Sequence, residues 1–152
     1  MDGMMELALQ TNTVTAASYP WHLRIVGALT LVWAAYGAWR FLAVQFGVFD
    51  GAGMATSELA QFASYPIWAS AFWALTVWGS VAGGALLLLR SSWAIQSFVV
   101  AVIGLIGTSA YQLAINVNPF DFDTMPIAMA NWIIAVVSLL FASMANSAGQ
   151  LR

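Results

Sequence analysis

The sequence carries very little charge. Among its 152 residues, four arginines, six acidic residues and no lysine make up 7% of the chain, whereas hydrophobic residues make up 62%. A water-soluble domain holds about 25% charged residues, because its surface faces water. The few charged groups present here could not cover such a surface. The sequence therefore predicts a membrane protein whose main solvent is lipid.

Other absences exclude whole classes of function. Cysteine is absent, so disulfides and thiol chemistry are excluded, and a lone histidine, His22, cannot by itself build a metal or haem site. A net charge of −2 without a basic cluster argues against nucleic acid, whose binding depends on many phosphate contacts. No nucleophile–base pair, phosphate loop or metal constellation occurs, so we expect no enzyme, catalytic residue, metal site or cofactor.

Charged residues divide the chain into four long apolar intervals. Because a helix rises 1.5 Å per residue, about 20 apolar residues cross a bilayer core, and each interval holds one such span. We therefore predict an all-α integral membrane protein with four transmembrane helices in an antiparallel up-down bundle. The predicted spans are residues 22–46, 66–89, 93–117 and 126–146 within a domain of residues 21–147.

The segments between the spans predict one further element. Residues 56–66, "TSELAQFASYP", hold a capping serine or threonine followed by apolar positions at helical spacing. We expect a short helix on the membrane surface, ending where the chain enters the membrane at Pro66. Residues 1–20 and 148–152 are predicted as tails.

The basic residues predict an orientation. In a four-span protein, Arg24, Arg90 and Arg152 fall on one side of the membrane, and Asp50, Glu58, Asp121 and Asp123 fall on the other side. Cytoplasmic loops carry the excess of arginine and lysine, so we expect both termini in the cytoplasm.

Small residues predict where the helices approach one another. The second span contains Gly79 and Gly83 at GxxxG spacing, with Ser80 and Gly84 beside them, and the third span contains Gly104 and Gly107. In lipid, such positions let helix backbones pack closely. They favour packing within one chain, and a self-association face is the alternative.

Three of the eight tryptophans lie deep in their spans. Trp33 and Trp78 are about 15–18 Å from the cytoplasmic ends, at 1.5 Å per residue. We expect them to form an aromatic core with Trp73. A pigment, quinone or lipid cavity beside them is the alternative.

Arg40 interrupts the first span, in "WAAYGAWRFLAV". Its position places it near the outer interface, where its long side chain can reach acidic loops. We expect it to form a structural ion pair with Asp50, Glu58, Asp121 or Asp123. An anion or headgroup site and a contact with a partner protein are the alternatives. The candidate polar cluster around it consists of Tyr36, Arg40, Asp50, Glu58, Tyr111, Gln112, Asn116, Asp121, Asp123 and Asn131.

The segments "ELAQFASYPIWASAFWALTVWGSVAGGALLLLRSSWA" and "GLIGTSAYQ" resemble a family of small four-span bacterial membrane proteins labelled sugar transporters or sugar:proton symporters. The resemblance covers about Trp21 to Trp132 and implies a bacterial inner membrane. Where family members carry an asparagine and an acid in the first span, this sequence has Ala34 and Arg40. That departure argues against proton coupling here.

Three functions follow as hypotheses. The first is a non-enzymatic accessory or scaffolding subunit of a larger membrane complex, because the chain is small and has short loops. The second is a small transporter working as a dimer, since four spans are few for a pathway. The third is binding of a lipid, pigment or quinone. The expected partners are membrane lipids and either other membrane subunits or a second copy of the chain.

Overall fold

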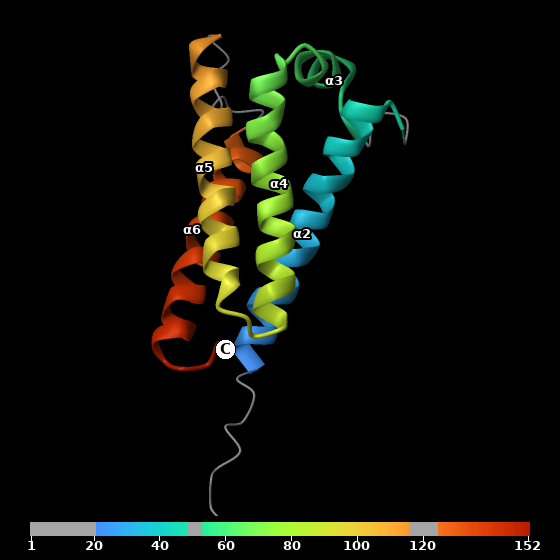
Figure 1. Ribbon diagram of the computed structural model, residues 1–152. Coiled ribbons are helices and arrows are strands. Elements are labelled where there is room, and N and C mark those ends of the chain that lie inside the picture. The colour runs from blue at the N-terminus through green and yellow to red at the C-terminus, as the bar shows by residue number, and fades with distance from the viewer. Residues whose placement is uncertain (1–20, 49–52, 116–124) are drawn as a thin grey trace, which may run out of the picture.

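The computed structural model describes residues 21–48, 53–115 and 125–152 (Figure 1). Four of its helices are long and apolar enough to cross a membrane. The described helices are α2 (Trp21–Phe46), α3 (Thr56–Ala63), α4 (Ile67–Leu88), α5 (Trp93–Ala114) and α6 (Met125–Ser147). The predicted fold class, a four-span bundle with a short helix before the second span, is confirmed. The chain is a multi-pass membrane protein.

Local sequence accounts for the helix boundaries near the second span. Pro66 is the N-cap of α4, where the N–H that proline lacks would have no partner within the helix. At its other end, α4 stops before Arg90, which adopts a φ of 60°. The left-handed conformation at Arg90 starts the tight turn into α5. The observed bounds of α4 therefore lie within the predicted span 66–89.

The four long helices alternate in direction and form a ring in the order α2, α4, α5, α6 (Figure 1). The α4–α5 interface is the most extensive, followed by α2–α4, while α6 contacts its neighbours α5 and α2 much less. At one end of the bundle α3 bridges the ends of α2 and α4 (Figure 1). We call this the α3 end, and we call the opposite end, which holds the α4–α5 turn, the turn end.

Glycine permits the close approach of α4 and α5. A Cβ atom at Gly104 would lie 2.5 Å from the backbone nitrogen of Thr76, and one at Gly79 would lie 2.9 Å from the backbone nitrogen of Ala101. Gly83 faces the ring of Phe98 in the same interface. The GxxxG pair of α4 is therefore packed within the chain.

The remaining small residues of the predicted set have similar roles. A Cβ at Gly107 would meet the ring of Phe72 at 2.4 Å, and one at Gly84 would lie 3.2 Å from the backbone of Leu31 in α2. Ser80, the remaining member, is half-buried on α4. Glycines on two faces of α4 thus bring it close to both α5 and α2.

The last residues of the chain close the turn end. Arg152 donates its backbone N–H to the carbonyl of Arg90 at 2.7 Å, and its own carbonyl accepts from the N–H of Ser92 at 2.8 Å. The preceding residue, Leu151, is buried in a core cluster with Leu23, Leu87, Ala94, Phe98, Ala142 and Ala145. Residues 150–152 are thus packed on the bundle rather than forming a free tail.

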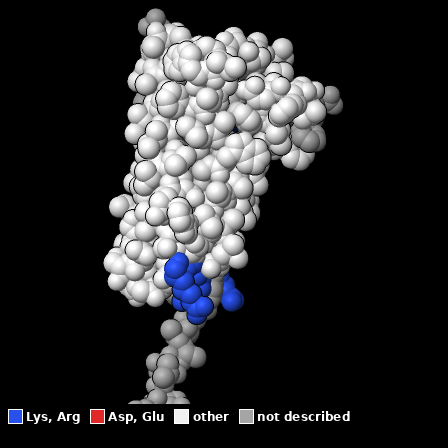
Figure 2. All heavy atoms as spheres, viewed as in Figure 1, with Lys and Arg blue, Asp and Glu red and all other residues white. Residues whose placement is uncertain are grey.

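Charged side chains gather at the turn end. Figure 2 shows arginine side chains at the lower end of the molecule, while the rest of that face is almost entirely uncharged. Arg24 lies in the first turn of α2, at this end, and Arg90 and Arg152 lie at the α4–α5 turn. The three arginines therefore lie at the same end of the bundle, as predicted.

Candidate functional site

The bundle is hollow at the α3 end. A cavity of about 490 Å³ lies among α2, α3, α4, α5 and α6, so every described helix contributes to its wall. Its wall combines aromatic side chains with polar ones. The polar lining side chains are Tyr36, Arg40, Ser57, Glu58, Gln61, Thr76, Thr108, Ser109, Gln112 and Asn131.

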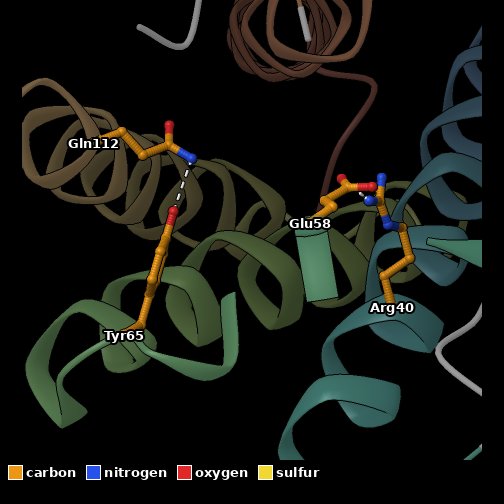
Figure 3. Close-up of polar contacts among 4 residues, drawn as sticks. All are labelled: Arg40, Glu58, Tyr65 and Gln112. Carbon is orange, nitrogen blue, oxygen red and sulfur yellow. Dashed lines mark hydrogen bonds and ion pairs between the residues drawn. The ribbon is translucent and has the colours of Figure 1, made fainter. Parts of the chain in front are cut away.

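An ion pair closes one side of this cavity. Arg40 of α2 donates from Nη2 to Oε1 of Glu58, which lies in the first turn of α3 (Figure 3). The Arg40 side chain is only 10% exposed and that of Glu58 is 31% exposed. The ring of Tyr36 lies one turn below, with its centroid 5.7 Å from Arg40 Cζ. Because a buried charge is costly unless paired, this contact neutralises Arg40 and holds α3 to α2.

A hydrogen bond closes the opposite side. Gln112 of α5 donates from Nε2 to the hydroxyl oxygen of Tyr65 at 2.9 Å, across the link between α3 and α4 (Figure 3). The Tyr65 ring also meets the ring of Tyr111 edge-on at 4.9 Å. Burial raises the pKa of the Tyr65 phenol, and the bond from Gln112 partly offsets that shift. Tyr65 is therefore a neutral phenol at physiological pH.

Aromatic stacking holds the C-terminal end of α3. Phe62 stacks on Trp73 of α4 with ring centroids 4.7 Å apart and an interplanar angle of 26°. Phe41 of α2 meets the same indole edge-on at 5.0 Å. Trp73 thus links three helices at the cavity wall. Together with the ion pair, this stack holds α3 across one end of the cavity.

Five predicted polar residues line the cavity, namely Tyr36, Arg40, Glu58, Gln112 and Asn131. Tyr111 packs beside it, against the rings of Tyr65 and Trp68. Of the four acids predicted as partners of Arg40, Glu58 makes the contact. The other predicted members, Asp50, Asn116, Asp121 and Asp123, lie outside the described residues.

The predicted aromatic core of Trp33, Trp73 and Trp78 is wrong, because the three side chains lie in different places: Trp73 at the cavity, Trp33 between α2 and α6, and Trp78 on the outside of α4. Trp78 is 46% exposed on the outer surface of α4. Trp33 instead donates its indole N–H to Oδ1 of Asn131 in α6 at 2.9 Å. At 100° per residue, Trp78 and Trp73 point to different sides of α4, so depth in the membrane alone did not determine which tryptophans meet.

A second hollow lies between α2 and α6. It has a volume of about 460 Å³ and its wall is almost entirely apolar, with Val26, Leu29 and Val32 on α2 and Ile133 and Val137 on α6. Below the tryptophan contact, Thr30 and Ser138 share a buried hydrogen bond of 2.9 Å between their hydroxyls. We call this hollow the α2–α6 groove.

Several functional candidates were missed from sequence. Gln61 and Thr108 line the cavity, and Tyr65 lies beside it through its hydrogen bond with Gln112. Gln61 lies one helical turn after Glu58, which is a spacing that could have indicated a shared face. For Thr108, whose hydroxyl donates to the carbonyl of Gly104 at 2.9 Å, no sequence signal indicates the cavity.

Among the residues that the structure describes, no group of three metal-ligating side chains occurs. No protein-family model, curated protein or solved structure matches the chain. The resemblance to small four-span bacterial proteins therefore stays a prediction, and the geometry of the cavity is the basis for a functional proposal.

Proposed function

We propose that the chain is a non-enzymatic membrane protein that binds an uncharged polar group of a small molecule in the cavity under α3. The observation that carries the proposal is the cavity itself, about 490 Å³ in volume and walled by all five described helices. Ligand sites in helical membrane bundles are built from concave surfaces with a few polar groups among aromatic ones. This cavity has that composition.

Charge supports an uncharged ligand. The described lining holds one cation, Arg40, and one anion, Glu58, and these two are paired with each other. An anionic ligand would have to displace Glu58 from Arg40, and a cationic one would have to displace Arg40 from Glu58. The remaining polar groups are hydroxyls and amides such as Ser109, Gln112 and Asn131, which suit a neutral hydrogen-bonding molecule.

The proposed function also includes a membrane location and an orientation. We place the protein in a bacterial inner membrane with both termini in the cytoplasm, because the turn end carries the arginines. Binding serves either an accessory subunit of a larger complex or a transporter, and both roles remain predictions. A dimer is not needed to make the cavity, because one chain forms its walls.

Mass spectrometry of the protein purified in mild detergent tests binding. We expect about one retained small molecule per chain. Ala128→Phe places a ring into the cavity from α6 and should remove the retained molecule. Ala71→Phe makes the same change on the exposed face of α4, outside the cavity, and should leave retention unchanged. A wild-type protein that retains nothing, or equal retention in both variants, would contradict the proposal.

The absence of cysteine makes the orientation simple to measure. A single cysteine at Ala60, exposed on α3, should react with a membrane-impermeant maleimide added to intact spheroplasts. A single cysteine at Ser147, exposed at the end of α6, should react only after the membrane is opened. The reverse pattern would place the turn end outside.

A further inference from the structure

The cavity and the α2–α6 groove adjoin one another. Tyr36 lines both. Trp33 lines the groove and Asn131 lines the cavity, and the hydrogen bond between them spans the boundary. The two hollows therefore lie side by side, with Tyr36 and the Trp33–Asn131 pair at the boundary between them.

The groove lies at the loosest interface of the ring. Of the four interfaces between neighbouring spans, α2–α6 is the least extensive. Among the described residues, the hydrogen bonds of Thr30 with Ser138 and of Trp33 with Asn131 cross it beside the groove, and the ring contact of His22 with Phe141 crosses it nearer the turn end. In lipid such side-chain hydrogen bonds contribute only modestly to helix association. The interface can therefore admit a chain without breaking a large packed surface.

The cavity and the α2–α6 groove differ in the polarity of their lining. The cavity offers hydroxyls, amides and a neutralised ion pair, whereas the groove offers almost only hydrocarbon. A molecule with one polar end and one apolar chain matches both parts at once. A fully polar ligand would leave the groove to annular lipid, and a fully apolar one would make no use of the hydroxyl and amide groups that line the cavity.

We propose that the ligand is a neutral single-chain amphiphile, whose polar group lies in the cavity and whose hydrocarbon chain leaves through the α2–α6 groove. This proposal rests on the proposed binding function and adds the chemical class of the ligand and its route. The ligand then enters laterally from the bilayer, past Tyr36 and the Trp33–Asn131 contact, rather than from water. The neutral charge follows from the Arg40–Glu58 pair.

Photolabelling tests the route. The probe is a monoacylglycerol with a diazirine near the end of its acyl chain, added to the purified protein in detergent and irradiated. We expect the label on α2 and α6 peptides that contain Leu29, Ile133 and Val137. An excess of unlabelled monoacylglycerol should compete, and an anionic fatty acid with the same chain should compete much less.

Two matched variants separate the groove from the lipid-facing surface. Val137→Trp fills the groove and should lower labelling by about tenfold, equivalent to about 1.4 kcal/mol. Val136→Trp makes the same change one residue away, at a position that is exposed but lines neither hollow, and should have little effect. If Val137→Trp does not purify as a folded protein, Ile133→Trp fills the same groove.

The outcomes are distinct. Label spread evenly over all outer surfaces, including the exposed face around Trp78, indicates annular lipid and overturns the proposal. Labelling that is equal in the two valine variants also overturns it. If Ala128→Phe still removes a retained molecule in either case, the proposed binding function stands and only the amphiphile and its route are wrong. If Ala128→Phe has no effect on retention, the binding function fails as well.

Discussion

At the turn end of the bundle, Phe98 is only 1% exposed and packs with Leu23 and Leu87, whereas at the α3 end Arg40 and Glu58 border a cavity of about 490 Å³. Both ends are built from the same four spans. The turn end is filled by large apolar side chains and closed by residues 150–152. The α3 end is held by an ion pair, a hydrogen bond and an aromatic stack around an open volume. The packed core is therefore at one end of the bundle, and the proposed binding cavity is at the other.

The largest expected effect comes from truncating the filled end. Phe98→Ala removes a ring that is almost fully buried against Gly83, and we expect it to lower the free energy of unfolding by about 3 kcal/mol. Phe62→Ala removes a ring that borders the cavity, so it should cost distinctly less. Thermal unfolding in detergent, followed by circular dichroism, measures both. Equal losses would remove the distinction between the two ends.

Glycine contacts provide the second test. Gly104→Ala places a Cβ 2.5 Å from the backbone nitrogen of Thr76, and backbone atoms cannot move aside easily, so we expect a loss of about 2 kcal/mol. Gly37→Ala is the matched control on α2 beside the cavity, because its nearest neighbour, Cγ2 of Val77, is 3.7 Å away. That variant should be neutral or slightly stabilising, since alanine is the better helix former. A neutral Gly104→Ala would contradict the close approach of α4 and α5.

The ion pair provides the third test. Glu58→Gln leaves the charge of Arg40 largely buried without its anion, and we expect a loss of about 2 kcal/mol, less than for a fully buried pair because Glu58 is partly exposed. The double variant Arg40→Met with Glu58→Gln removes both charges and should recover much of that loss. A double variant less stable than Glu58→Gln alone would show that Arg40 has other partners that matter more.

The smallest effect is a dependence on pH confined to alkaline conditions. Because burial raises the pKa of Tyr65, the unfolded chain loses this proton more readily than the folded protein. The stability contributed by the neutral phenol is complete below about pH 10 and is lost as pH rises through the folded pKa. Tyr65→Phe should reduce the fall in melting temperature above that pH. An unchanged alkaline fall would place Tyr65 in water.

The spans could be predicted because charge placement in a membrane protein has few solutions. Four apolar intervals leave room for one helix each, and the structure has a helix in every interval. The residues that bound them are Arg24, Asp50, Glu58, Arg90, Asp121, Asp123 and Arg152. The short helix before α4 was also predictable, from its apolar spacing, although its N-cap is Ala55 without a side-chain cap hydrogen bond and not the expected serine or threonine. These features depend on local sequence and on the thickness of a bilayer.

The cavity could not be predicted because it depends on how far the helices stand apart. Residues at the same depth can face the interior or the lipid, and Trp73 and Trp78 on α4 show both results. The contact between Trp33 and Asn131 joins residues 98 positions apart and has no local signal. Arg40 was expected at an acidic outer loop, and Glu58 was among its predicted partners, but the enclosed space beside the pair follows only from the arrangement of the helices.

The weak attachment of α6 has a consequence for assembly. The α2–α4 and α4–α5 interfaces join spans that follow one another in the chain, whereas α6 must also reach back to α2, as in the contact of Ser138 with Thr30 over 108 residues. Contacts between distant segments form late, because the entropy of loop closure must be offset first. We therefore expect α2, α4 and α5 to assemble as an open three-helix intermediate during synthesis. Docking of α6 would then complete the cavity and the α2–α6 groove, and an amphiphile already in the bilayer could be enclosed at that moment.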